Sequence, residues 1–273
     1  MKNLLIRTLT GIFLIVLIVG AILLGELSFA ILIATLFLLG TRELMQIHSC
    51  KPDLKTILIA LSGVMLIAAS YLINTDLLKP EWIILPPALY LAAFMLSFLN
   101  KGGPGRATIR FNLLSFFWLS VPLSMYLSLG WFENKNEYHY TLPLLIICLL
   151  WINDTFAYLI GSLFGKHKMT PILSPGKTWE GFFGGLLITV LAGWISFKIT
   201  NSYTVGIWII ISITTVVFGF LGDISESKIK RIYKIKNSGS LLPGHGGILD
   251  RFDSLLLAAP AVFIVILIVN AIA

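Results

Sequence analysis

Residues 227–253, SKIKRIYKIKNSGSLLPGHGGILDRFD, combine basic side chains, a glycine-histidine turn and two carboxylates. The Gly-His-Gly-Gly run at 244–247 is followed closely by Asp250 and Asp253. Glycines let a backbone approach a ligand closely, and a helix that begins after them directs free N–H groups at an anion. Asp250 and Asp253 share one side of such a first turn, and Asp223 ends the preceding apolar segment. Oxygen ligands without cysteine suit Mg²⁺ bound together with substrate phosphates, so we expect Asp223, Asp250 and Asp253 to be metal ligands.

Simpler interpretations of the same segment stay open. Carboxylates beside lysines are often plain salt-bridge partners. Residues 224–236 mix apolar and basic side chains, which also predicts an amphipathic helix held against anionic lipid by its charges. His245, surrounded by glycines, is expected to contact a phosphate or a nucleotide rather than a metal.

A second polar group lies inside an apolar segment. Asp154, Ala157, Tyr158 and Gly161 follow helical spacing and therefore share one face. A carboxylate in mid-membrane costs about 2.5–3.5 kcal/mol on insertion scales, so this face is expected to line a polar cavity. The alternative is that Asp154 and its neighbour Asn153 only fix helix packing.

The loop that follows, residues 161–181, offers hydroxyls and lysines suited to phosphate oxygens: Ser174, Lys177 and Thr178. Its PGKT sequence resembles the end of a phosphate-binding P-loop. However, Pro171 stands where the motif requires its first glycine, and no preceding strand is expected. A soluble-type nucleotide-binding fold is therefore excluded. A membrane-surface loop that is merely basic would carry the same lysines.

These groups must be positioned by membrane helices. The chain is 57% hydrophobic and only 12% charged, which is typical of an integral membrane protein. Continuous rather than alternating apolar runs exclude a membrane β-barrel. The sequence predicts an all-α, polytopic protein with about nine transmembrane helices, at residues 8–24, 27–45, 56–73, 83–99, 112–132, 141–161, 182–199, 205–221 and 252–272.

The distribution of basic residues predicts the orientation. With nine spans and a cytoplasmic N-terminus, only Lys79, Lys135 and Lys198 of the 20 Lys and Arg residues fall outside, as the positive-inside rule requires. The net charge of +7 thus belongs to one membrane face and its anionic lipids, and no nucleic-acid partner is expected. Residues 1–273 are expected to form a single membrane-embedded domain, in which 1–140 show little chemistry and 141–273 are the catalytic half.

Two stretches of this sequence resemble the phosphatidate cytidylyltransferases, also called CDP-diacylglycerol synthases, of bacterial type. The likeness covers about residues 150–255. In the downstream stretch it is carried by Ser227, Lys230, Arg231, Lys236, Gly239, Leu242, Pro243, 245–247, Asp250, Arg251 and Asp253. In the upstream stretch it is carried by 153–155, Ala157, Tyr158, 164–166, Ser174, Pro175 and 177–181. Asn237 and Gly176 depart from the family pattern, which commonly has aspartate and lysine there.

The resemblance implies a cytidylyl transfer from CTP to phosphatidate, giving CDP-diacylglycerol and pyrophosphate, at the cytoplasmic face of a bacterial inner membrane. It also implies Mg²⁺ on Asp223 and Asp250, and homo-oligomerisation stays open. Fixed positive charge would come from Lys228, Lys230, Arg231 and Arg251. Substrate contacts would come from Asp154, Tyr158, Ser174, Lys177, Thr178, His245, Gly246 and Gly247.

Three other functions are weighed against this one. A CTP-dependent membrane lipid kinase needs the same substrate types but releases CDP. The departure at Asn237 leaves room for a catalytically inactive lipid-binding relative. A transporter would not need the glycine-histidine turn, and internal repeats are not recognisable.

Overall fold

The computed structural model describes residues 2–99, 105–133, 137–171, 173–200 and 202–272, and is almost entirely helical. Two of the basic residues used to predict the orientation, Lys101 and Lys135, lie outside the described residues. The chain divides into two compact units. Unit 1 consists of Met1–Tyr140 and Ile235–Arg251, and unit 2 of Thr141–Lys234 and Phe252–Ala273. The boundary after Tyr140 coincides with the expected start of the catalytic half, whereas the glycine-histidine turn groups with unit 1.

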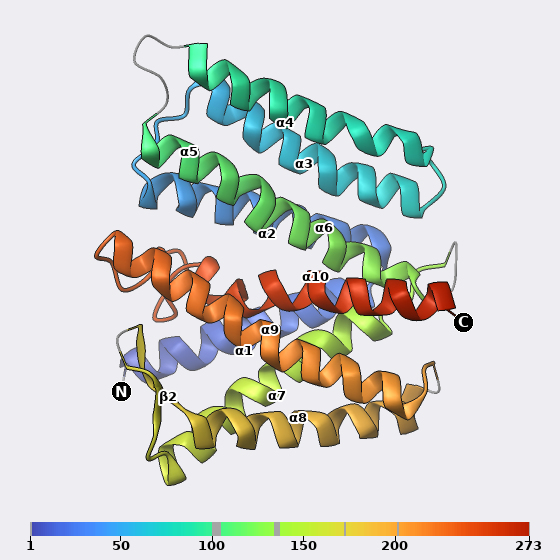
Figure 1. The fold of residues 1–273 in the computed structure, drawn as a ribbon, viewed down its shortest axis with the longest axis vertical. Coiled ribbons are helices and arrows are strands. Elements are labelled where there is room, and N and C mark those ends of the chain that lie inside the picture. Colours follow the sequence, from blue (N-terminus) through green and yellow to red (C-terminus); the bar gives the residue numbers. More distant parts are fainter. Residues whose placement is uncertain (1, 100–104, 134–136, 172, 201, 273) are drawn as a thin grey trace. The chain divides into compact units, whose positions relative to one another are not determined.

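Unit 1 is built from successive helices (Figure 1). They are α1 (Lys2–Leu23), α2 (Glu26–Ile47), α3 (Leu54–Asn74), η1 (Pro80–Ile84), α4 (Leu85–Leu96), η2 (Ser97–Leu99), α5 (Arg106–Leu113), the π-helical η3 (Leu114–Ser120), α6 (Val121–Ser128) and η4 (Leu129–Trp131). Asp53 starts α3 with a capping box: its carboxyl accepts from the Thr56 N–H at 2.8 Å, and the Thr56 hydroxyl accepts from the Asp53 N–H at 3.0 Å.

Unit 2 contains α7 (Thr141–Phe164), a two-stranded hairpin of β1 (Lys168–Thr170) and β2 (Ser174–Thr178), α8 (Trp179–Thr200) and α9 (Val205–Ile232). The last helix, α10 (Leu249–Ile272), begins in unit 1 and continues in unit 2. The strands are antiparallel, with Lys168 opposite Thr178 and Thr170 opposite Ser174.

Eight helical segments in the described part of the chain are long and apolar enough to cross a membrane. This confirms an all-α, polytopic membrane protein, because a chain in lipid must satisfy its backbone groups within helices. The predicted fourth span, 83–99, corresponds to a shorter apolar helix at Pro80–Leu96. Prolines at 80, 86 and 87 account for its broken form, because proline lacks the N–H that a continuous helix needs.

Aromatic and aliphatic side chains fill the core of unit 1. Ile59 and Leu66 of α3 pack with Tyr90 and Ala93 of α4 and with Phe116 of η3. The Tyr90 and Phe116 rings stack with their centroids 4.3 Å apart. This cluster joins α3, α4 and η3 into one packed layer.

In unit 2, small residues allow the helices to approach closely. The helices α7, α8 and α9 lie next to one another (Figure 1). A Cβ at Gly185 of α8 would lie 2.8 Å from the Asn153 Oδ1 and 3.0 Å from the Ala157 Cβ of α7. Glycine at such positions brings helix backbones together in membranes. The close approach of α7 and α8 sets the distance between Asn153, Asp154 and the hairpin.

Two local expectations are wrong. Residues 224–236 do not form a separate interfacial helix, because α9 continues without a break to Ile232. An i,i+4 ion pair between Glu226 and Lys230 supports the continuation. Residues 161–181 are not a plain loop, since they contain the β1–β2 hairpin.

Candidate functional site

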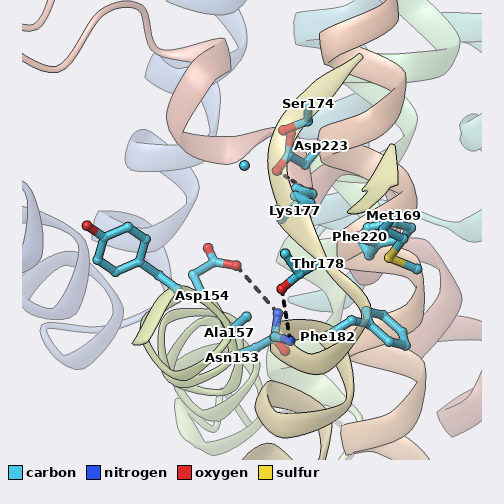
Figure 2. Close-up of a pocket in the computed structure, with 14 residues that line it drawn as sticks. Asn153, Asp154, Ala157, Met169, Ser174, Lys177, Thr178, Phe182, Phe220 and Asp223 are labelled. Carbon is cyan, nitrogen blue, oxygen red and sulfur yellow. Dashed lines mark hydrogen bonds and ion pairs between the residues drawn. The ribbon is translucent and has the colours of Figure 1, made fainter. Parts of the chain in front are cut away.

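A cavity of about 330 Å³ lies in unit 2 between α7, the hairpin and α9 (Figure 2). Each of these elements contributes polar and apolar side chains. The lining consists of Asn153, Asp154, Ala157, Tyr158, Met169, Ser174, Gly176, Lys177, Thr178, Gly181, Phe182, Phe220, Asp223 and Ser254. Six of the predicted site residues are therefore brought together here: Asp154, Tyr158, Ser174, Lys177, Thr178 and Asp223.

The strongest polar contact in the cavity joins the hairpin to α9. The Lys177 Nζ lies 2.5 Å from the Asp223 Oδ2, and the two side chains are 25% and 31% exposed. The same ammonium lies 4.6 Å from the centre of the Phe220 ring. Figure 2 shows the Lys177 side chain extending from β2 to Asp223. A site that holds an ammonium and a carboxylate side by side can bind both an anionic and a cationic group.

The hairpin is anchored at its base to the first turn of α8. The Trp179 N–H donates to the His167 carbonyl at 3.0 Å. The Glu180 carboxyl accepts from the His167 N–H and contacts the His167 Nδ1 at 2.6 Å. These contacts fix the strand that carries Ser174, Lys177 and Thr178.

The floor of the cavity is formed where α7 and α8 meet. The Thr178 hydroxyl accepts from the Gly181 N–H at 3.2 Å. The Asn153 amide donates to the Asp154 carboxyl at 3.5 Å. Both contacts are drawn in Figure 2. The intramembrane carboxylate thus belongs to the cavity wall, in keeping with the polar face expected on this helix.

Acidic side chains of unit 2 interact with one another around the cavity. The Asp253 carboxyl interacts electrostatically with Asp223 and Asp154, and also with the ammonium of Lys230. Asp223 in addition accepts a hydrogen bond from the Ser227 hydroxyl at 3.3 Å. Carboxylates that repel one another in a partly dry environment favour a bound cation.

This donor set fits Mg²⁺ by its chemistry. No group of three or more His, Cys, Asp or Glu side chains is arranged to hold a metal ion among the residues that the structure describes. Mg²⁺ does not need one, since one or two carboxylates with waters and substrate phosphates complete its shell. Asp223 and Asp253 supply two such carboxylates within unit 2.

The basic end of α9 lies beyond the cavity lining. Lys228 is exposed. Lys230 pairs with the buried Glu226. Arg231 donates to the Leu173 carbonyl of the hairpin at 3.5 Å. Arg231 thus supports the hairpin, while Lys228 presents its charge to the surroundings.

The glycine-histidine turn belongs to unit 1 and is tightly folded. Gly244 and Gly246 have φ angles of 76° and 86°, which favour glycine. The Leu242 N–H donates to the Gly246 carbonyl and the His245 N–H to the Leu242 carbonyl, both at 2.9 Å. Within this unit, Arg7 of α1 donates to the Gly244 carbonyl at 2.9 Å. The turn is therefore a defined structure that closes before α10 begins.

Asp250 folds back onto this turn. Its Oδ2 accepts from the Gly247 N–H at 2.8 Å and from the Ser238 N–H at 3.0 Å. Arg251 donates from its Nε to the His245 carbonyl at 3.0 Å. The convergence of Asp250 with Asp223, which belongs to unit 2, stays a prediction.

The His245 ring is placed among positive charges. Burial, followed by the charge of Arg251 and then that of Arg7, lowers the pKa of His245 below its ordinary value. A lowered pKa favours the neutral ring at neutral pH, so His245 offers a hydrogen bond rather than a charge. Its expected contact with a phosphate or a nucleotide stays a prediction.

Sequence reasoning missed several residues. Ser254 and Phe220 line the cavity, and nothing in their local sequence indicates it. Nothing in its local sequence distinguishes Arg7 from the other basic residues of the inner face, yet it donates to the Gly244 carbonyl. Glu43 of α2 has no counterpart in the chemical motifs, yet it is 3% exposed and contacts the turn that precedes α10. A lone acidic residue near the end of an apolar span is the signal that could have identified it.

Comparisons with known proteins agree with one another. Residues 5–269 match the model of a family described as the cytidylyltransferase family. A protein of Staphylococcus haemolyticus named phosphatidate cytidylyltransferase is 30% identical over 269 residues, which covers 96% of this chain and 98% of the relative. Proteins of the same name from Staphylococcus epidermidis and Staphylococcus aureus (strain COL) are 32% and 31% identical over 268 residues, with the same coverage.

Proposed function

The chain belongs to the cytidylyltransferase family, and from this premise we propose that it transfers a cytidylyl group from CTP to phosphatidate. The products are CDP-diacylglycerol and pyrophosphate. The observation that carries this proposal is the cavity in which Lys177 and Asp223 lie 2.5 Å apart next to Ser174 and Thr178. The ammonium and the hydroxyls suit phosphate oxygens, and the carboxylate suits the cation that accompanies a nucleotide triphosphate.

The reaction needs no general base. A phosphate monoester has a second pKa of about 6, so the phosphatidate phosphate is largely a dianion at neutral pH. One of its oxygens attacks the α-phosphorus of CTP, a new P–O bond forms, and the bond to the bridging β-phosphate oxygen breaks. The electron pair leaves with pyrophosphate. The protein therefore has to bring together two anions and neutralise the leaving group.

Residues of this chain supply that neutralisation. Lys177 would bind a phosphate oxygen from the hairpin side, with Ser174 and Thr178 as hydroxyl donors. Lys228, Lys230 and Arg231 at the end of α9 would add positive charge on the side of unit 2. Charge from Arg251, backbone N–H groups from Gly246 and Gly247, and a hydrogen bond from His245 stay predictions from the sequence.

Asp223 and Asp253 of unit 2 would hold Mg²⁺, and the part that the sequence assigns to Asp250 stays a prediction. The ion, when bound, draws negative charge from the phosphates of the nucleotide. In this structure the Lys177 ammonium is the ion-pair partner of Asp223.

The acceptor lipid is proposed to reach the cavity from the bilayer. Tyr158, which lines the cavity, is 74% exposed. Leu159 and Leu163 of the same helix are 44% and 73% exposed, as expected for side chains that face lipid. Acyl chains can thus remain in the membrane while the phosphate reaches Asp154 and Lys177. We place the hairpin on the cytoplasmic side, because the positive-inside rule assigns residues 161–181 to it.

Transfer of labelled phosphorus tests this function. The purified protein in liposomes is given CTP labelled at the α-phosphorus, phosphatidate and Mg²⁺, and label is expected in extracted lipid with one pyrophosphate per lipid formed. Label that remains in CDP would identify a lipid kinase instead. No turnover would indicate an inactive relative.

A matched pair of aspartate variants sharpens this test. Asp250→Asn is expected to abolish the transfer with the fold retained. Asp76→Asn is the control, because Asp76 has a φ of 57°, which asparagine tolerates, and lies at the opposite end of α3 from the capping box. Normal activity of Asp250→Asn would remove Asp250 from the site.

A further inference from the structure

Glu43 of α2 is a buried acidic residue that the proposed chemistry does not use. Its side chain is 3% exposed. Its Oε1 accepts from the Ile248 N–H at 2.8 Å, and its Oε2 accepts from the Leu249 N–H at 3.0 Å. The Ser238 hydroxyl donates to the same Oε2 at 2.9 Å. One carboxyl group thus accepts from two N–H groups at the start of α10, which a helix leaves unpaired, and from the Ser238 hydroxyl.

These contacts continue to Asp250 through Ser238. The Ser238 N–H donates to the Asp250 Oδ2 at 3.0 Å, and the Ser238 hydroxyl accepts from the Asp250 N–H at 3.3 Å. Ser238 therefore bonds to Glu43 on one side and to Asp250 on the other. A shift of the Glu43 carboxyl would change the position of Ser238 and, with it, the direction of the Asp250 side chain.

Two glycines leave room for the Glu43 carboxyl. A Cβ at Gly239 would lie 2.6 Å from the Glu43 Oε1. A Cβ at Gly247 would overlap both the Ser238 hydroxyl and the Glu43 carboxyl. Glycine is therefore needed at 239 and 247 to make room for the buried Glu43 carboxyl, and not only to let a ligand approach the backbone.

We propose that Glu43 is a positioning residue for cytidylyl transfer, which holds the start of α10 and Ser238 so that Asp250 keeps one orientation. The proposal rests on the proposed function for the identity of the reaction. It assigns a role in the reaction to α2, a helix far from the signature residues in the sequence. Partners that orient a ligand residue typically contribute about 10–100-fold to affinity or activity.

Glu43→Gln tests this role at nearly constant side-chain volume. The amide keeps one acceptor oxygen and replaces the other with a donor, so at least one of the three contacts is lost. We expect kcat for cytidylyl transfer to fall by about 10–100-fold, with KM for phosphatidate unchanged. Glu26→Gln is the matched control, because Glu26 lies at the other end of α2, where the Tyr71 hydroxyl donates to it at 3.4 Å. It should behave as wild type.

Hydrogen exchange separates positioning from general stabilisation and does not depend on activity. In Glu43→Gln, amides of 238–250 should exchange faster, while those of α3, residues 54–74, stay unchanged. Equal acceleration in α3, or no acceleration at 238–250, would overturn the proposal. A local acceleration with a kcat within about 3-fold of wild type would also overturn it, since this lies below the range for orienting partners.

Ser238→Ala provides a second variant should Glu43→Gln fail to fold. It removes the hydroxyl between Glu43 and Asp250 and leaves the Ser238 N–H in place. The same local pattern with a smaller loss of kcat is expected, and an unchanged kcat would overturn the proposal. If wild type transfers no cytidylyl group, the proposed function fails, whereas the exchange pattern still decides whether Glu43 orders this segment.

Discussion

Replacing Lys177 by methionine tests the chemistry of the cavity most directly. Methionine retains the length and apolar character of the lysine side chain and removes only the ammonium. Asp223 then loses its partner while it remains in electrostatic contact with Asp253. In the proposed reaction, the same ammonium neutralises phosphate oxygens of the substrates, so both binding and catalysis should suffer.

The size of the effect follows from the geometry. Two unit charges separated by 2.5 Å, the distance between the Lys177 Nζ and the Asp223 Oδ2, attract each other by ~7 kcal/mol at an effective dielectric constant of ~20 and by ~2 kcal/mol in bulk water. Both side chains are about a third exposed or less, so screening brings the net value towards that of a charged hydrogen bond, about 1.5–3 kcal/mol. An interaction of that size with a phosphate oxygen corresponds to a loss of about 10–150-fold in kcat/KM.

The assay is the transfer of labelled phosphorus from CTP to lipid, measured over a range of CTP concentrations. Lys198→Met is the matched control. Lys198 belongs to the last turn of α8 and, like Lys177, lies over aromatic rings, with its Nζ 5.8 Å from the centre of Trp194. This variant loses an ammonium of the same kind away from the cavity and should retain the wild-type kcat/KM.

Equal kcat/KM values for Lys177→Met and Lys198→Met would refute the reasoning. Such a result would mean that the Lys177 ammonium only neutralises Asp223 in the resting protein. Thermal denaturation would show whether Lys177→Met loses activity because it unfolds. In that case Lys177→Arg, which keeps the charge, should restore folding and part of the activity.

Two further predictions concern packing and pH. Gly185→Val should destabilise unit 2 by about 1–3 kcal/mol, the typical cost of overpacking, because its Cβ would lie 2.8 Å from the Asn153 Oδ1. An unchanged thermal midpoint would contradict the close approach of α7 and α8. Burial and the charge of Arg251 lower the pKa of His245, so the folded protein protonates His245 less readily than the unfolded chain does. The free energy of unfolding should therefore fall as the pH drops from ~6.5, the pKa in the unfolded chain, through the lowered pKa in the folded protein. Between about pH 8 and about pH 5, the thermal midpoint of wild type should therefore fall more than that of His245→Gln. Equal falls in the two midpoints would contradict the lowered pKa of His245.

The membrane spans were predictable from composition, because a backbone in lipid must form its hydrogen bonds internally and therefore adopts long apolar helices. The helical face of Asp154 and Tyr158 was predictable for the same reason, since 3.6-residue periodicity is a local property. The hairpin around Ser174 was not, because it depends on Glu180 binding back to His167. The continuation of α9 to Ile232 was also missed, since an interfacial helix and an extended span have the same basic and apolar composition.

Residue types and their order alone determined that this chain is a helical membrane protein, and they predicted phosphate-binding and cation-binding side chains in its second half. The tertiary structure decided which of them meet. The pairing of Lys177 with Asp223 depends on how the hairpin packs against α9, and the contact of Glu43 with residues 238–249 joins positions about 200 apart in the chain. Local periodicity carries no information about such pairs, because their distances depend on how whole helices pack and not on the residues next to them.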